Sequence, residues 1–113
     1  FIPGGDGPYN IIHHQDKQKV LDILTQAYNE GKIIAAICHG PWVLAAADLV
    51  DGKNITCWDD QPMIDDLRAH GATVDTSKSV IRDENIITAN GPEAINIFTE
   101  EIIKVFIEKY GSR

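Results

Sequence analysis

The chain has 113 residues, and its 17 Asp and Glu residues outnumber its 10 Lys and Arg residues, which gives a net charge of −7 at pH 7. This length provides for one domain. Hydrophobic residues make up 43% and charged residues 24%, a composition that excludes a disordered or collagen-like chain. The acidic balance argues against nucleic acid and anionic membranes as partners and favours a small neutral or cationic substrate.

The cysteine and hydropathy patterns predict a soluble protein of the reducing cytoplasm. Cys38 and Cys57 are too few for a disulfide framework or a zinc cluster. The apolar stretches are far shorter than the roughly 20 residues that a bilayer-spanning helix needs, and we expect no signal peptide. Phe1 and Ile2 precede Pro-Gly-Gly and resemble the end of a strand. We therefore expect that N-terminal strands of the domain are missing from this sequence.

The first half of the chain predicts a helix, a strand and a second helix. Residues 16–30 place apolar side chains at three- and four-residue spacing before Gly31, which predicts an amphipathic helix. Residues 33–37 are apolar throughout, as in a central strand covered on both faces. Residues 40–47 predict a helix, because Pro41 is tolerated in a first helical turn.

The second half predicts shorter strands between two further helices. Strands are expected over 54–58, 72–75, 79–82 and 86–89, the last two joined by a tight turn at Glu84 and Asn85. Helices are expected from 60 or 61 to 70 and, after Asn-Gly-Pro, to about Tyr110. Strands that alternate with helices predict an α/β layered fold with mostly parallel strands. Sites in such folds lie at the carboxyl ends of the strands, which is the position of Cys38.

The sequence around Cys38 is typical of a nucleophile elbow. Small residues flank Cys38 between an apolar strand and a helix, which permits the sharp turn that lifts a nucleophile out of a sheet. The N-terminus of the following helix favours the thiolate over the thiol. His39 is adjacent and is a candidate base or proton donor. The alternative from the residues alone is a small buried cysteine at a strand end with a histidine that caps the helix.

Three segments together resemble the ThiJ/PfpI family. They are Ile-Pro-Gly-Gly at 2–5, Ala-Ile-Cys-His-Gly-Pro at 36–41 and Ile-Thr-Ala-Asn-Gly-Pro at 87–92. The resemblance covers nearly the whole chain and implies a flavodoxin-like α/β three-layer sandwich of the class I glutamine amidotransferase type. Residues 1–113 would be the C-terminal two-thirds of one such domain. Family members include intracellular peptidases, glyoxalase III-type enzymes, deglycases and chaperones.

The resemblance also implies roles for particular residues. By position, Cys38 matches the family's nucleophile and His39 the histidine beside it, while the N–H groups of Gly5 and His39 match its oxyanion hole. These roles agree with physical expectation, since the residue after an elbow nucleophile directs its N–H toward the attacked carbonyl oxygen and a Gly-Gly turn permits close backbone approach. An ordinary tight turn at Gly4 and Gly5 is the alternative.

The third catalytic residue is left open by the sequence. In the peptidase branch a glutamate shortly after the Gly-Gly turn reaches the histidine of a neighbouring subunit, and Tyr9 stands at that place here. Asp59 and Asp60, just after the strand expected to end at Trp58, are the acids best placed by topology to orient His39, and Asp6 is a weaker candidate. Solvated turn or cap residues are the alternative for these acids.

The remaining histidines, cysteine and tryptophans receive mainly structural interpretations. His13 and His14 lack a carboxylate or cysteine at ligand spacing, so no metal is expected. His70 suits a helix C-terminus, where a cation is favourable. Cys57 is expected in the core. Two aromatic residues, Tyr9 and Trp42, are candidates for the wall of the pocket.

The leading functional hypothesis is a cysteine-dependent hydrolase or a glyoxalase-like enzyme that needs no cofactor. The Cys38 thiolate would add to the carbonyl of a peptide or of a small carbonyl compound. His39 would protonate the leaving amine of a peptide, whereas in a glyoxalase or deglycase a hemithioacetal would rearrange or hydrolyse. The alternative is a redox-sensing stress protein or chaperone in which Cys38 is oxidised. The exposed sheet edge of so short a chain predicts pairing with the missing segment, and the family resemblance implies a homo-oligomer.

Overall fold

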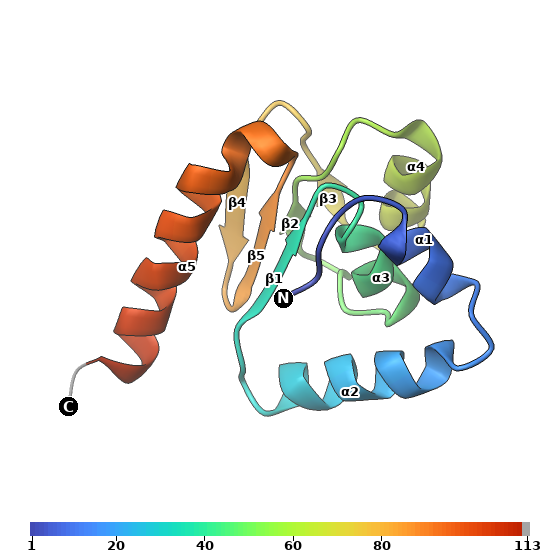
Figure 1. Ribbon diagram of the computed structural model, residues 1–113, viewed down its shortest axis with the longest axis horizontal. Helices are drawn as coiled ribbons and strands as arrows, with labels where there is room; N and C mark the ends of the chain where they lie inside the picture. Colours follow the sequence, from blue (N-terminus) through green and yellow to red (C-terminus); the bar gives the residue numbers. More distant parts are fainter. Residues whose placement is uncertain (112–113) are drawn as a thin grey trace.

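The computed structural model describes residues 1–111, in which helices and strands alternate (Figure 1). Residues 112 and 113, the last of the expected domain, lie outside the described residues. The elements follow one another as α1 (Gly7–Ile12), α2 (Lys17–Asn29), β1 (Ile34–Ile37), α3 (Pro41–Ala46), β2 (Asn54–Ile55), α4 (Gln61–Ala69), β3 (Thr73–Val74), β4 (Val80–Asp83), β5 (Ile86–Ala89), the 3₁₀ helix η1 (Pro92–Ala94) and α5 (Ile95–Tyr110).

The main sheet is small and mixed, which confirms the α/β class. Its strand order is β1-β5-β4. β1 and β5 are parallel, with a register that runs from Ile34 opposite Ile86 to Ile37 opposite Ala89. β4 and β5 form the expected antiparallel hairpin. A separate parallel pair, β2 and β3, lies beside β4.

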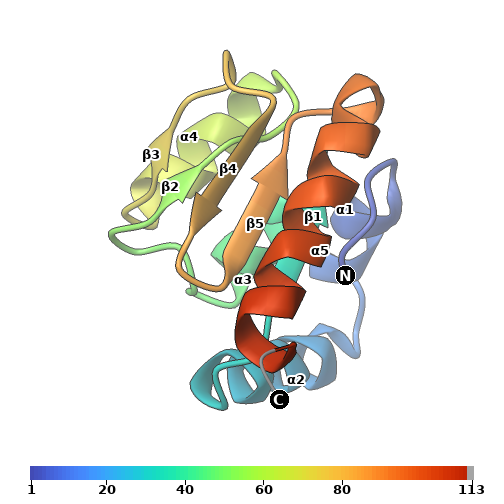
Figure 2. The same ribbon diagram turned by 90° about the vertical axis from the view of Figure 1, so that its left-hand side faces the viewer.

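Helices cover both faces of the main sheet, and each face has its own apolar core (Figure 2). Side chains alternate along β1, because successive residues of a strand point to opposite faces. Ala36 packs with Leu44 of α3 in one core, and Ile37 packs with Phe98 of α5 in the other. All four residues of β1 are buried, as the apolar run over 33–37 predicts.

The strand expected over 54–58 is only two residues long. Ile55 pairs with Val74, but the next N–H groups bond elsewhere: that of Thr56 donates to Thr88 Oγ1 at 3.0 Å, and that of Trp58 donates to the Cys38 carbonyl at 2.9 Å. Residues 56–58 therefore run along the end of the main sheet toward Cys38. This departure from strand pairing brings the residues after Trp58 to the elbow.

The segment between Gly5 and His13, for which the sequence predicts no helix, contains helix α1. Pro8 occupies its first turn, where the missing N–H costs no helical hydrogen bond. Ile11 and Ile12 are partly buried against the core that includes α3. The helix was missed because it is six residues long and starts with Gly-Pro, a pair that also begins turns.

Residues 1–5 approach the carboxyl end of β1. Ile2 forms a parallel bridge with Ala36, in which its N–H donates to the Ala35 carbonyl at 2.7 Å and its carbonyl accepts from the Ile37 N–H at 3.2 Å. The Gly-Gly turn that follows therefore lies beside Cys38. Two segments distant in sequence are joined there by backbone hydrogen bonds.

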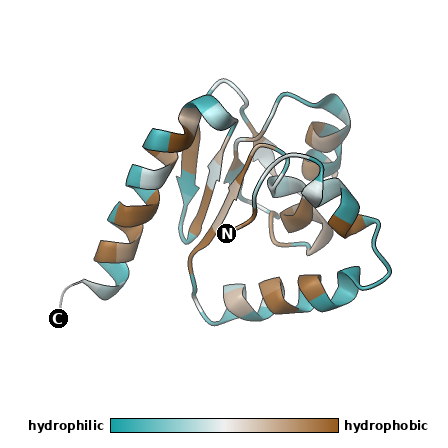
Figure 3. Ribbon diagram, viewed as in Figure 1, coloured by the Kyte–Doolittle hydropathy of each residue, from teal (hydrophilic) through white to brown (hydrophobic). Residues whose placement is uncertain are grey.

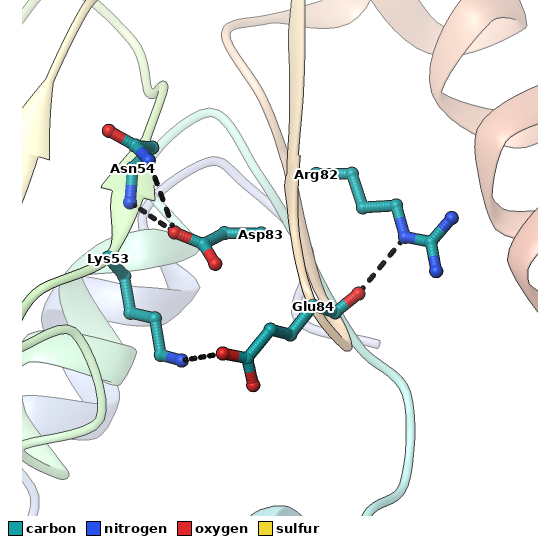
Figure 4. A network of polar contacts seen from close by, with 5 residues as sticks. All are labelled: Lys53, Asn54, Arg82, Asp83 and Glu84. Carbon is teal, nitrogen blue, oxygen red and sulfur yellow. Dashed lines mark hydrogen bonds and ion pairs between the residues drawn. The ribbon is translucent and has the colours of Figure 1, made fainter.

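A polar network at the opposite end of the sheet joins β2 to the β4–β5 hairpin (Figure 4). Asp83 Oδ2 accepts from the Asn54 N–H at 2.8 Å, and Lys53 lies 3.4 Å from the Glu84 carboxylate. The Tyr28 hydroxyl and Glu84 raise the pKa of Lys53, although burial lowers it. Lys53 therefore carries its charge at neutral pH, and the network holds the two sheets together away from the elbow.

Candidate functional site

Cys38 follows β1 directly and has a backbone φ of 63°, in the left-handed region. Such a conformation is uncommon for a residue with a side chain and costs of order 1 kcal/mol or more. Neighbouring strands hold it there, since the Cys38 N–H donates to the Ala89 carbonyl at 2.9 Å and its carbonyl accepts from Trp58. Helix α3 begins three residues later. The strand–turn–helix arrangement that the sequence predicts is present.

Glycines at two positions make this turn sterically possible. A Cβ on Gly4 would lie 2.6 Å from Cys38 Cβ, and one on Gly40 would lie 2.7 Å from the Ile2 carbonyl oxygen. Both distances are shorter than real Cβ contacts. The chain therefore needs glycine on both sides of Cys38, one from the Gly-Gly turn and one from the start of α3.

A thiol, an imidazole and a carboxylate lie in a line at the elbow. Cys38 Sγ is 3.6 Å from His39 Nδ1, and His39 Nε2 is 3.0 Å from Asp60 Oδ2. The His39 and Asp60 side chains are 24% and 28% exposed, so the pair is half-buried yet reachable. A carboxylate in this place fixes the imidazole orientation and stabilises the imidazolium form. The other ring nitrogen then faces the sulfur and can exchange a proton with it.

The sequence left open which acid orients His39, and the structure brings Asp60 to it. Asp60 is the N-cap of α4, and its N–H donates to the Trp58 carbonyl at 2.8 Å. Asp59 lines a different cavity, together with Trp58. Asp6 is the N-cap of α1 and forms no side-chain cap hydrogen bond.

A cavity of about 370 Å³ opens beside the thiol. It is lined by Gly4, Gly5, Ile37, Cys38, Pro92 and Ile95. Within residues 1–111, the N–H groups of Gly5 and His39 donate no hydrogen bond. Unpaired N–H groups next to a nucleophile are suited to stabilise negative charge on an oxygen.

Tyr9 and Trp42, the candidates for the pocket wall, pack against each other away from this lining. Their ring centroids are 5.9 Å apart in an edge-on arrangement. The Trp42 indole N–H donates to Asp66 Oδ2 at 2.8 Å, which joins α3 to α4. The structure does not bring either side chain into the cavity beside Cys38.

Cys57 differs sharply from Cys38 in its surroundings. It is fully buried, whereas Cys38 is partly exposed. Burial, followed by the negative charges of Asp60 and Asp59, raises the pKa of the Cys57 thiol from 9.0 to about 12. Cys57 therefore remains a neutral core thiol at physiological pH.

The remaining histidines lie away from the thiol. His13 and His14 are exposed, and the His14 ring accepts the Asp16 N–H at 3.0 Å. His70 is the C-cap of α4, with Nδ1 2.8 Å from the Asp66 carbonyl oxygen. Among residues 1–111 no group of three or more His, Cys, Asp and Glu side chains is placed to hold a metal ion.

Three cavity residues after β5 were not singled out individually from the sequence. Pro92 and Ile95 line the cavity beside Cys38, and Glu93 lines the one at Trp58 and Asp59, because β5 ends beside β1 and Asn-Gly-Pro follows Ala89 at the same sheet edge as Cys38. The rule that parallel strands carry sites at their carboxyl ends was the available signal. It becomes usable only when the pairing of β1 with β5 is known.

Cys38 lies at a strained strand–helix turn of a small α/β domain, in line with His39 and Asp60. This arrangement is typical of proteins that have a nucleophile elbow. The model of the DJ-1/PfpI family matches residues 1–105, and this chain belongs to that family. No helix within residues 1–111 is long and apolar enough to cross a membrane.

Relatives and solved structures agree with this assignment. The chain is 36% identical to an uncharacterized protein of Archaeoglobus fulgidus, over 92% of this chain and 58% of the relative. It is 27% identical to protein/nucleic acid deglycase 2 of Escherichia coli, over 93% of this chain and 58% of that protein. A two-domain protein of Anabaena variabilis with a DJ-1/ThiJ/PfpI-like domain superposes with a TM-score of 0.82 and 32% identity, over 98% of this chain and 30% of that one. The chain thus spans less than two thirds of the length of these relatives.

We expect iodoacetamide to label Cys38 and to leave Cys57 unmodified in the folded protein. With a pKa of about 12, only roughly one Cys57 thiol in ten thousand is ionised at pH 8, and burial excludes the reagent as well. Peptide mass spectrometry after timed labelling at pH 6 to 9 measures both rates. Equal labelling rates for Cys38 and Cys57 in the native protein would contradict this prediction. A control in urea, where both cysteines are accessible, shows that the reagent can reach each of them once the protein is unfolded.

Gly4→Ala is expected to slow Cys38 labelling at least about tenfold and to destabilise the protein by about 1–3 kcal/mol, because the new methyl group overlaps Cys38 Cβ. Gly7→Ala is the matched control, since a Cβ there meets nothing within 4 Å. Labelling kinetics and urea unfolding of both variants provide the comparison. If Gly4→Ala behaves like Gly7→Ala, the close approach of the two segments is not needed to position the thiol.

Proposed function

We propose that the protein is a cysteine-dependent hydrolase that removes carbonyl adducts from amines, as a deglycase does. The line Cys38–His39–Asp60 at a strained turn is the observation that carries the proposal, with sulfur 3.6 Å from the imidazole and the imidazole 3.0 Å from the carboxylate. The relative from Escherichia coli is named a protein/nucleic acid deglycase, and relatives from two Pyrococcus species are also named deglycases.

The proposed reaction begins with an adduct in which an amine nitrogen is bonded to a carbon that carries a hydroxyl group next to a ketone. The hydroxyl proton passes through His39 to the nitrogen, the C–N bond breaks and the free amine leaves. The Cys38 thiol passes its proton to His39 and the thiolate forms a C–S bond to the resulting aldehyde carbon; His39 then returns the proton to the oxyanion, which gives a hemithioacetal. A hydrogen shift to the neighbouring ketone carbon converts it into a 2-hydroxy thioester. One water molecule cleaves the thioester, so the products are the amine and a 2-hydroxy acid.

Two features of the site support this sequence of steps. Gly5 lines the cavity beside the thiol and His39 directly follows Cys38, and in our proposal the unpaired N–H groups of these two residues would hold the oxyanion that forms when the thiolate adds. Asp60 would keep the His39 ring aligned during both proton transfers. No metal or cofactor is required, and a reducing cytoplasm would keep the thiol available.

A peptidase, a glyoxalase and a redox sensor use parts of the same site. Tyr9, which stands where the peptidase branch has a glutamate, argues against the peptidase. A glyoxalase would follow the same steps from the free 2-oxoaldehyde onward. In the redox-sensing stress protein or chaperone, the partly exposed Cys38 thiol would be oxidised without turnover. Fast Cys38 labelling in a protein that hydrolyses no adduct would favour that reading.

Asp60→Asn is expected to lower kcat for adduct hydrolysis by about 10²-fold with little change in KM, because the neutral amide no longer stabilises the imidazolium. Cys38→Ser is expected to lose all turnover. Asp65→Asn is the matched control, since Asp65 is an exposed acid of α4 that bonds only Gln61 among residues 1–111. The measurement is release of free amine from an adduct of methylglyoxal. Full activity of Asp60→Asn would remove Asp60 from the proposed site.

We further propose that this chain is the C-terminal part of a single flavodoxin-like domain, whose remaining segments cover one face of α5. Apolar residues recur along α5 (Figure 3), and Ile103, Phe106, Ile107 and Tyr110 are among its exposed members. Phe106 and Tyr110 line an open cavity with Phe1. An apolar face of this kind is normally covered, and the relatives are longer than this chain. A second copy of the chain is the alternative cover.

In the full-length protein, Phe106→Glu is expected to lower the free energy of unfolding by about 2 kcal/mol or more, because a covered phenylalanine contributes that much through burial. Lys104→Gln, at an exposed polar position of the same helix, is expected to change it by less than about 0.5 kcal/mol. Urea unfolding measures the stability of each variant, and sedimentation measures its oligomeric state. If a second copy covers this face, Phe106→Glu would dissociate a dimer as well as destabilise the protein. If the remaining segments of the domain cover it, the oligomeric state would not change. If Phe106→Glu does not change the free energy of unfolding, this face of α5 is exposed to solvent in the full-length protein and the proposal is wrong.

A further inference from the structure

A second cavity, of about 380 Å³, lies beside the one at Cys38 and is not used by the steps proposed above. It is lined by residues 57–59, Thr76 and residues 90–93. Pro92 lines both cavities. The backbone of Trp58 is bonded to the Cys38 carbonyl at 2.9 Å, so the two cavities are neighbours at the same end of the sheet.

The Trp58 indole forms an aromatic surface in this second cavity. A Cβ on Gly91 would lie 2.8 Å from the six-membered part of the ring, so the ring rests directly on the backbone of the Asn-Gly-Pro segment. The side chain nevertheless remains 46% exposed. An exposed tryptophan held against a glycine backbone presents a π surface to whatever enters the cavity, and π surfaces attract cations.

Two carboxylates, those of Asp59 and Glu93, line the same cavity as Trp58. Asp59 is adjacent to Asp60 in sequence, but Asp60 bonds His39 while Asp59 faces this cavity. Within residues 1–111 neither the Asp59 nor the Glu93 side chain forms a hydrogen bond or an ion pair. An aromatic surface beside two carboxylates that have no direct partner is suited to a flat or compact cation.

From this arrangement we infer that the cavity at Trp58, Asp59 and Glu93 binds the cationic nitrogen group of the substrate, a guanidinium or an alkylammonium. The inference rests on the proposed function and assigns its substrate class. The carbonyl part of the adduct occupies the cavity at Cys38. The nitrogen group to which it is bonded extends past Pro92, which lines both cavities, and contacts Trp58. The enzyme therefore prefers carbonyl adducts of arginine and lysine side chains to adducts of thiols.

The first experiment compares two substrates in full-length protein, the methylglyoxal adducts of Nα-acetylarginine amide and of N-acetylcysteine amide. In the double variant Asp59→Asn, Glu93→Gln, we expect kcat/KM for the arginine adduct to fall at least about tenfold through a higher KM. For the uncharged cysteine adduct it should change less than about twofold. The double variant Asp48→Asn, Glu100→Gln removes two exposed charges away from the cavity and is expected to leave both values unchanged. Equal losses for both adducts, or no loss, would overturn the inference.

A binding experiment tests the cavity independently of turnover. Calorimetric titration with Nα-acetylarginine amide and with its uncharged analogue Nα-acetylcitrulline amide compares a cation with a neutral group of nearly the same shape. We expect the arginine derivative to bind at least about tenfold more tightly, and the Asp59→Asn, Glu93→Gln variant to lose this difference. Equal affinity for the two ligands in wild-type protein would overturn the inference. Absence of adduct hydrolysis together with the expected arginine preference would instead refute only the proposed deglycase reaction.

Discussion

The left-handed backbone at Cys38 constrains everything that surrounds it. A residue with a side chain adopts φ of 63° only where neighbours hold it, and here the carbonyl of Ala89 and the N–H of Trp58 bond its two backbone groups. The first bond requires β1 and β5 to be parallel and in register, and the second requires the chain to leave β2 after two residues. The close approach of Gly4 then excludes any larger residue. The main sheet, the short β2 and the Gly-Gly turn thus all meet at this one turn and together hold it.

This constraint also determines which acid meets His39. Because Trp58 is bonded to the Cys38 carbonyl, the next residues are carried past the elbow before α4 begins at Gln61. Asp60, as N-cap of α4, has an extended backbone with φ of −126°, and its carboxylate reaches His39 Nε2 rather than the helix N–H groups. A cap residue usually satisfies its own helix. Here the carboxylate is used for the imidazole, which favours a role in orienting it.

The sequence predicted the local features well and the distant pairings poorly. Helix and strand positions followed from apolar spacing, and the elbow followed from small residues around Cys38. Sequence alone did not decide between Asp59 and Asp60, because adjacent residues have the same topological position and only the backbone direction at Trp58 separates them. Helix α1 was hidden by Gly-Pro, which begins turns as readily as helices. Trp42 was expected near the thiol because it follows the elbow closely, and Tyr9 because it stands where the peptidase branch has a glutamate, but α1 and α3 pack their rings against each other.

The separation of Asp59 from Asp60 gives two neighbouring acids different electrostatic surroundings. Asp60 faces an imidazole that can become positive, so its charge is balanced within the protein whenever His39 is protonated. Asp59 and Glu93 line a cavity, and among residues 1–111 neither forms an ion pair. In the proposal, a positive group that enters this cavity would be attracted to both carboxylates, and a thiol adduct cannot supply one. A net charge of −7 adds to the attraction at longer range. The proposed preference for basic leaving groups would therefore come from the charge distribution around Trp58 and would not depend on the chemistry at Cys38.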